Sequence, residues 1–108
     1  LNEILQSRFG VNSGESEKII PDEYSLEQNY PNPFNPTTTI RYDLPKDGVV
    51  QLEVFDIIGR KITTLVNTHQ SAGRYEVNFD AGKLASGVYI YKLQSGQYIS
   101  SKKMMLLK

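Results

Sequence analysis

The chain has 108 residues, 39% of them hydrophobic, and its 12 basic and 12 acidic residues leave no net charge. That length is enough for one small domain with a modest core. The absence of cysteine excludes both a disulfide framework and a thiolate metal site. No apolar run approaches the roughly 18 residues that a membrane-spanning helix requires, so we expect no direct membrane span.

The charges are unevenly distributed along the chain. Residues 1–36 carry 2 basic and 6 acidic side chains, whereas residues 81–108 carry 5 lysines and no acidic residue. A basic tail can meet an acidic partner or an anionic lipid. We favour the alternative that lysines on a final edge strand block unwanted strand pairing, because their spacing is strand-like and they form no dense cluster.

The N-terminal segment, residues 1–22, is expected to be a flexible linker. Residues 10–18 are polar and rich in glycine and serine, although the apolar residues of the first nine positions have the spacing of a short helix. Because the sequence begins with Leu1, we expect it to be a fragment of a longer protein. We place the domain boundary near Asp22, so that the domain spans residues 23–108.

The stretch from Tyr30 to Pro36 holds three of the five prolines of the chain. Each proline fixes φ near −65° and disfavours helical geometry in the residue before it, so neither a helix nor a central strand can pass through. We expect a stiff, extended lead-in to the strand that begins at Thr37. Tyr30 and Phe34 are expected to fold over one edge of the domain.

The rest of the domain has the pattern of β-structure. β-branched and aromatic residues alternate with polar ones, as in half-buried strands. The alternation places Ile40, Tyr42 and Leu44 on one buried face. The predicted strands are residues 24–28, 37–44, 49–56, 61–66, 74–79, 88–93 and 97–107. About seven short strands separated by turn residues predict an all-β fold, an antiparallel β-sandwich of Greek-key type.

Three local features complete this prediction. In the strand 61–66, Ile62 and Leu65 are expected to be the buried residues. Residues 67–73 are expected to form a longer polar loop. Residues 80–87 are expected to form a corner with one helical turn, capped by Asp80, whose Leu84 fills the core.

The sequence offers little for catalysis. Its one histidine, His69, falls in the predicted polar loop, and no nucleophile elbow, phosphate-binding glycine loop or His-Glu-x-x-His motif is present. The aspartates occur at strand ends and turns, where they bond the local backbone, and they lack the spacing of a calcium loop. We therefore expect a non-enzymatic protein without catalytic residues, cofactor or metal.

Aromatic residues support one alternative function. The 7 tyrosines and 4 phenylalanines, without tryptophan, suggest an accessory module that binds polysaccharide through exposed residues such as Tyr30 or Tyr98. Most of them fall on apolar strands, where core packing is the simpler explanation. Nucleic-acid binding is not indicated, since basic residues are not interleaved with aromatics.

Four segments occur in an order that resembles a known family. They are Leu26-Glu27-Gln28-Asn29-Tyr30-Pro31-Asn32-Pro33-Phe34-Asn35-Pro36, Val54-Phe55-Asp56-Ile57-Ile58-Gly59-Arg60-Lys61, Leu84-Ala85-Ser86-Gly87-Val88-Tyr89, and Lys102-Lys103-Met104-Met105-Leu106-Leu107-Lys108. Together they resemble the type A C-terminal sorting domain of the type IX secretion system. The chain is also similar to the immunoglobulin-like domain of the flagellar hook-capping protein.

This resemblance implies an immunoglobulin-like sandwich that serves as an address for a larger exported protein. The cargo would cross the periplasm and pass through the type IX outer-membrane translocon to the cell surface or the medium. A sortase-like peptidase would then remove the domain from its upstream passenger within residues 1–22. The recognition signals that the resemblance implies are Pro31, Asn32, Pro33, Asp56, Gly59, Arg60, Gly87, Tyr89, Lys103, Met104, Met105, Leu106, Leu107 and Lys108.

Each of these residues also has a structural alternative. The prolines can simply close the sandwich, Gly59 can simply make its turn, and the residues from Met104 to Leu107 can simply fill the core. In so small a domain, fold and signal overlap. The final strand would serve as an edge open to strand addition by a partner.

Overall fold

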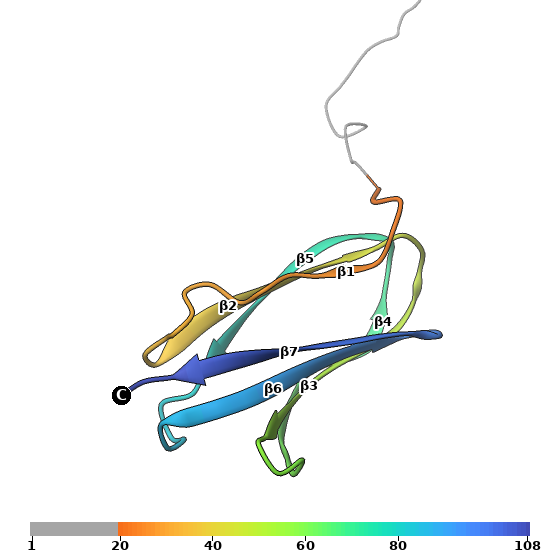
Figure 1. Ribbon diagram of the computed structural model, residues 1–108. Coiled ribbons are helices and arrows are strands. Elements are labelled where there is room, and N and C mark those ends of the chain that lie inside the picture. The colour runs from red at the N-terminus through yellow and green to blue at the C-terminus, as the bar shows by residue number, and fades with distance from the viewer. Residues whose placement is uncertain (1–19) are drawn as a thin grey trace, which may run out of the picture.

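The strand-forming residues of the sequence assemble into two antiparallel sheets (Figure 1). The computed structural model describes residues 20–108, so the predicted linker and its short helix fall almost entirely outside the described residues. The strands are β1 (Ser25–Leu26), β2 (Thr37–Leu44), β3 (Gly48–Asp56), β4 (Lys61–Gln70), β5 (Gly73–Asp80), β6 (Gly87–Ser95) and β7 (Tyr98–Leu106). Within residues 20–108 there is no helix with the length and apolar character needed to cross a membrane.

The strand order identifies the sandwich. One sheet has the order β1-β2-β5 and the other the order β4-β3-β6-β7, with antiparallel neighbours throughout. Sequence neighbours β2 and β3 therefore lie in different sheets, which is the Greek-key arrangement of an immunoglobulin-like sandwich. The predicted fold class is confirmed.

The core lies between the sheets and is filled by the alternating residues. The predicted inward residues of β2, including Ile40, Tyr42 and Leu44, are fully buried. They face the inward side chains of β3 and β6, among them Leu52 and Tyr91, which are also fully buried. Because side chains alternate along a strand, one correct register places every second residue in the core.

Strand β4 departs from the predicted alternation. Ile62 is 37% exposed and Leu65 is half-buried, so the expectation that Ile62 is buried is wrong. The register against β3 skips one β4 residue at two places, and the skipped residues are Leu65 and Ile62. Each bulge inserts an extra residue and turns the following side chains to the other face.

The predicted polar loop over residues 67–73 is also wrong in its first part. Strand β4 continues to Gln70, with Val49 opposite His69 and Gly48 opposite Gln70. The polar residues 67–70 resemble a loop in sequence, yet each of them pairs with a residue of β3. His69 therefore lies on an edge strand.

The corner after β5 contains a tight turn in place of the expected helical turn. The Leu84 N–H donates to the Ala81 carbonyl at 3.0 Å, and the Asp80 carboxylate accepts the Gly82 N–H at 2.8 Å. Asp80 thus stabilises the turn through its side chain, as such residues do in Asx turns. Ala81 is the fully buried residue here, whereas Leu84 packs half-buried against the core.

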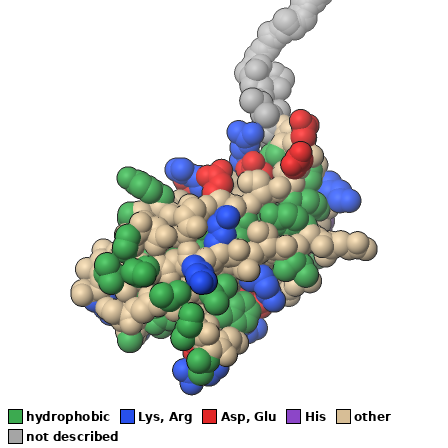
Figure 2. Space-filling view, in the orientation of Figure 1, with side chains coloured by type: hydrophobic (Ala, Val, Ile, Leu, Met, Phe, Trp, Pro, Cys, Tyr) green, Lys and Arg blue, Asp and Glu red, His purple; other side chains and the backbone are tan. Residues whose placement is uncertain are grey.

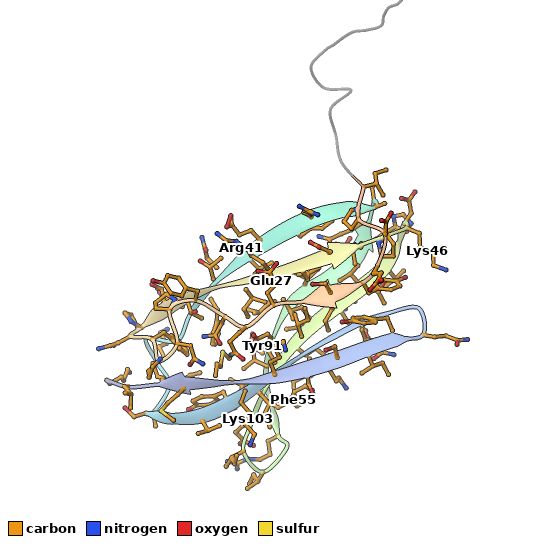
Figure 3. The ribbon with its side chains drawn as sticks, turned by 45° about the horizontal axis from the view of Figure 1, so that its top comes forward. Glu27, Arg41, Lys46, Phe55, Tyr91 and Lys103 are labelled. Carbon is orange, nitrogen blue, oxygen red and sulfur yellow. The ribbon has the colours of Figure 1, made fainter. Side chains whose placement is uncertain are left out.

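Residues 27–36, which we call the closing segment, bond to both sheets. The buried Tyr91 hydroxyl of β6 accepts the Asn29 N–H at 2.8 Å and donates to the Glu27 carbonyl at 2.7 Å (Figure 3). Burial raises the pKa of this hydroxyl to about 12, against a smaller opposite effect of the Asn29 N–H. The hydroxyl therefore stays neutral and available for both bonds.

The far end of the closing segment pairs with the C-terminal strand. Phe34 donates its N–H to the Met105 carbonyl at 2.9 Å and accepts the Leu107 N–H at 3.0 Å. Phe34 is 2% exposed and folds into the core as expected, but Tyr30 is 77% exposed and does not. Tyr30 instead pairs with Thr39 through its backbone, which turns its side chain to solvent.

We predict that Tyr91→Phe lowers the free energy of unfolding by about 2 kcal/mol, because it leaves a buried N–H and a carbonyl without their partner. Urea unfolding followed by circular dichroism measures the change. Tyr98→Phe is the matched control, since Tyr98 stacks on Tyr24 and its hydroxyl bonds no other described residue. Equal losses in the two variants would contradict the proposed importance of the Tyr91 bonds.

Candidate functional site

The residues predicted as recognition signals come together at one end of the four-stranded sheet. The strand register places Asp56 opposite Tyr89 and Tyr89 opposite Met104. Gly87 lies opposite Leu106 in the same register. Segments separated by up to about half of the chain therefore meet at the ends of β3, β6 and β7 (Figure 1).

Asp56 organises the hairpin between β3 and β4. Its carboxylate accepts the N–H groups of Ile58 at 3.1 Å and Arg60 at 2.9 Å, and it pairs with the Arg60 guanidinium at 2.7 Å. The side chain is 13% exposed. This desolvation raises the pKa of the carboxyl, but the bonds from Arg60 and Ile58 outweigh it and leave the pKa below its ordinary value.

Gly59 closes the same hairpin. Its φ of 92° lies in the region that L side chains rarely adopt, and its N–H donates to the Asp56 carbonyl at 3.0 Å. The hairpin leaves Ile57 and Ile58 at its tip, 62% and 71% exposed. Asp56, Gly59 and Arg60 thus stabilise the hairpin itself, and Ile57 and Ile58 between them face solvent.

Tyr89 has a structural contact of its own. Its side chain is 8% exposed, and its hydroxyl donates to the Ala85 carbonyl at 2.7 Å. A tyrosine near the start of this strand that bonds back to the preceding corner is the tyrosine corner of immunoglobulin-like domains. Gly87 begins the strand that carries it.

The proline stretch joins this end of the sheet through Asn32. Its side-chain oxygen accepts the Met105 N–H at 2.9 Å. The Pro31 carbonyl accepts bonds from Asn29 and Thr38, while the rings of Pro31 and Pro33 remain exposed. The stretch therefore fixes the C-terminal strand through both side-chain and backbone bonds.

The C-terminal residues divide between the core and solvent. Met104 and Leu106 are buried, whereas Lys103, Met105 and Leu107 are exposed. Lys108 is held by its N–H, which donates to the Ser86 hydroxyl at 3.0 Å, and by its ammonium, which donates to the Gly82 carbonyl at 2.7 Å.

The closing segment occupies part of the edge of β7. Beyond the Met105 and Leu107 bonds to Phe34 and Asn32, the Gln28 side chain donates to the Lys103 carbonyl at 2.7 Å. The expectation of a final strand open along its length is therefore wrong for its C-terminal half. In the described part of the chain, the edge of β7 is unpaired only before Lys103.

Sequence reasoning missed an apolar surface at this end of the domain. The outward face of the four-stranded sheet carries a row of Phe55, Ile90 and Lys103 across three strands, beside a pair of Val88 and Met105. Figure 3 labels Phe55 and Lys103 of this row. With the hairpin tip, these residues form what we call the outer patch. Its members are Phe55, Ile57, Ile58, Val88, Ile90, Lys103 and Met105.

The outer patch combines apolar and basic groups. The Lys92 ammonium lies 5.2 Å from the centre of the Phe55 ring, a cation–π distance. Hydrophobic side chains gather at this end of the molecule in the space-filling view, around the end of β7 and the start of β6 (Figure 2). The signal in the sequence was that the first half of β6 carries apolar residues, Val88 and Ile90, at its outward positions as well, which a strand covered on one face does not require.

The described residues hold one sizeable cleft and no cluster of metal-ligating side chains. Within residues 20–108, no three His, Asp or Glu side chains gather closely enough to hold a metal. A cleft of about 670 Å³ lies between β4 and β5, lined mainly by apolar groups such as Ile62 and Phe79, with Asp80 and Lys83 at its charged margin. His69 is not among its lining residues.

The tyrosines do not form the platform that the polysaccharide alternative requires. Tyr30 alone is exposed, while the other six are buried or half-buried. Tyr98, which that alternative also invoked, is half-buried and stacks on Tyr24 with ring centres 4.7 Å apart. A single exposed ring gives a sugar no extended aromatic surface.

Comparisons with known proteins agree with this architecture. A family model described as a secretion system C-terminal sorting domain matches residues 28–107. Among solved structures, dimeric latent PorU from Porphyromonas gingivalis is similar over 90% of this chain, with a TM-score of 0.61 and 23% sequence identity. The match covers 10% of the PorU chain, and it shows the fold. No curated protein is significantly similar to the chain.

The strand order and the closing segment define an immunoglobulin-like sandwich. The family match extends from that segment to the C-terminal strand, and the chain therefore belongs to the family of secretion system C-terminal sorting domains. Domains of this family are the sorting signals of the type IX secretion system. The chain accordingly interacts with type IX secretion machinery and marks a protein for the cell surface or the extracellular space.

The lowered pKa of Asp56 gives a pH-dependent prediction. A carboxyl whose pKa is lower in the folded state stabilises the fold fully above its ordinary value of 3.8, and this contribution is lost as the pH falls through the lowered pKa. Asp56→Asn should therefore be less stable than the wild type at about pH 6, and the difference should shrink below about pH 4. Urea unfolding across this range measures it, with the exposed Asp22→Asn as control. A difference independent of pH would contradict the role of the charge.

Gly59→Ala should lower the free energy of unfolding by about 1 kcal/mol, because alanine tolerates the positive φ poorly. Open space surrounds the position, so the cost arises from the backbone and not from a clash. Gly48→Ala is the matched control, since its new methyl group would lie an ordinary 3.6 Å from the Ser95 hydroxyl. Thermal unfolding of the three proteins measures the difference, and equal stability of Gly59→Ala and wild type would overturn the prediction.

Proposed function

We propose that residues 23–108 are a non-catalytic address whose outer patch is the surface read by the type IX translocon. The passenger is covalently joined upstream and reaches the translocon through the periplasm. A sortase-like outer-membrane peptidase then cuts the chain within residues 1–22. The accessory polysaccharide-binding role finds no supporting surface among the described residues.

The observation that carries this proposal is the exposure of apolar side chains on an otherwise well-packed domain. Ile57, Ile58 and Met105 are 62%, 71% and 40% exposed, and they lie at one end of one sheet. Exposed apolar side chains that gather at one end of a sheet are typical of a protein-interaction surface. Lys103 adds a charge that can orient the partner.

The recognition residues implied by the family divide into two groups under this proposal. Asp56, Gly59, Gly87, Tyr89, Met104 and Leu106 build the end of the sheet, because each is engaged in the hairpin, the corner or the core. The exposed group meets the partner or adjoins it. That group consists of Pro31, Asn32, Pro33, Arg60, Lys103, Met105, Leu107 and Lys108.

The position of the chain entry supports the same assignment. Tyr24 stacks on Tyr98, and its hydroxyl lies close to Gly96, so the chain enters beside the β6–β7 hairpin. That hairpin is at the end of the sheet opposite to Leu106 and Gly87. The described chain therefore begins, at Ile20, at the end of the sandwich away from the outer patch (Figure 1).

Export of a fluorescent passenger tests the proposal. The passenger carries a signal peptide and residues 1–108 in a bacterium with a type IX system, and fluorescence at the cell surface and in the medium is measured. The double substitution Lys103→Glu and Met105→Ser should reduce export at least about tenfold, because it removes a charge and an apolar contact from the patch. Both side chains are exposed, so folding is retained, as circular dichroism would verify.

The control is Lys46→Glu with Val49→Ser, which reverses one lysine charge and replaces one exposed apolar residue by serine at the other end of the sheet, where Val49 is 57% exposed. It should be exported like the wild type. Full export of the patch variant would overturn the patch assignment, and retention of the wild-type fusion in the periplasm would overturn the address itself. Mass spectrometry of the released passenger should find its new C-terminus within residues 1–22, and a cut elsewhere would contradict the proposed junction.

A further inference from the structure

The tip of the β3–β4 hairpin goes against the residue preferences of turns. Turns favour Gly, Asn, Asp, Ser and Pro, whereas this one places Ile57 and Ile58 in solvent, 62% and 71% exposed. Neither side chain belongs to the buried core or packs against it. A local departure from the rules of folding, without a structural gain, is expected at functional positions.

The hairpin holds these two side chains in a fixed place. Asp56 receives the N–H groups of Ile58 and Arg60, Gly59 bonds back to the Asp56 carbonyl, and the Asp56 N–H donates to the Arg60 carbonyl at 2.9 Å. The tip is therefore ordered before any partner arrives. Pre-organisation of this kind reduces the entropy lost on binding.

The charges next to the tip are balanced within the hairpin. The Arg60 guanidinium pairs with Asp56 at 2.7 Å, and the Lys61 ammonium pairs with Glu53 at 3.3 Å. A loop that inserts into an anionic membrane relies on unpaired cations around its apolar tip to attract lipid headgroups. Both hairpin cations here already have a carboxylate partner, which favours an uncharged apolar pocket on a protein.

We propose that Ile57 and Ile58 form an apolar knob that inserts into an uncharged pocket on a protein of the secretion machinery. This inference rests on the proposed function and names the contact residues within the outer patch. Asp56, Gly59 and Arg60 are then positioning residues, and partner specificity comes from the two side chains that they present. Phe55, which directly precedes Asp56, continues the apolar surface onto the sheet.

The double substitution Ile57→Ser and Ile58→Ser in the export fusion tests the knob. Export should fall at least about tenfold, since burial of even one isoleucine in a partner pocket contributes a factor of that order to binding. The purified full chain should keep its thermal midpoint, because both side chains are exposed. Ile57→Leu with Ile58→Leu should restore most of the export, since leucine preserves the apolar volume.

The control is Val49→Ser with Ile99→Ser, which removes two apolar side chains that are 57% and 59% exposed at the other end of the same sheet. This control should be exported like the wild type. If the serine knob variant is exported as well as the wild type, the knob is wrong while the address stands. If the wild-type fusion is itself retained, the proposed function fails first.

A sedimentation experiment separates a protein pocket from a lipid surface. The purified 108-residue chain and its serine knob variant are mixed with vesicles of phosphatidylethanolamine and phosphatidylglycerol. Both should remain in the supernatant to the same extent. Vesicle binding by the wild type that is lost in the variant would overturn the protein pocket, because the knob would then insert into lipid.

Discussion

The bonds of residues 27–36 to both sheets hold the sandwich closed along one side, and the position of the C-terminal strand depends on them. The buried Tyr91 hydroxyl fixes the start of this segment, and Phe34 fixes its end by pairing with Met105 and Leu107. Proline restricts the unfolded chain as well as the folded one, so ordering this stretch costs less conformational entropy than ordering an ordinary loop. One short stretch therefore both closes one side of the sandwich and holds the C-terminal half of β7 in place.

Because of this coupling, the residues that fold the domain overlap with those that the family resemblance implies as recognition signals. Asp56 and Tyr89 satisfy neighbouring backbone groups, and Leu106 fills the core, so each has a structural reason to be present. A domain of this size buries a limited fraction of its surface, so most of its residues are needed to stabilise the fold. Loss of export on substitution of such a residue would reflect misfolding as readily as a lost contact, and exposure is what separates the two.

The period-two pattern of the sequence predicts most of the core residues. It fails where the pairing between strands determines which side chains are buried. Strand β2 has one buried face and repeats every second residue, and its predicted inward residues Ile40, Tyr42 and Leu44 are buried. In β4 the two bulges at Ile62 and Leu65 break that period, and no local signal announces them. Residues 67–70 have the composition of a loop, and only their pairing with β3 makes them part of a strand. Tyr30 and Phe34 have similar neighbours in sequence, and only the contact with β7 buries one and leaves the other exposed.

The residues that the family resemblance implies as signals could be named from the sequence, but the outer patch beside them could not. Whether Phe55, Ile90 and Met105 adjoin depends on the register of three strands, which spans about half of the chain. The same register places the outer patch at the end of the sheet opposite to the point where the chain enters. Under the proposed function, a surface at that end stays accessible to a partner, because the described chain enters the domain at the other end, beside the β6–β7 hairpin.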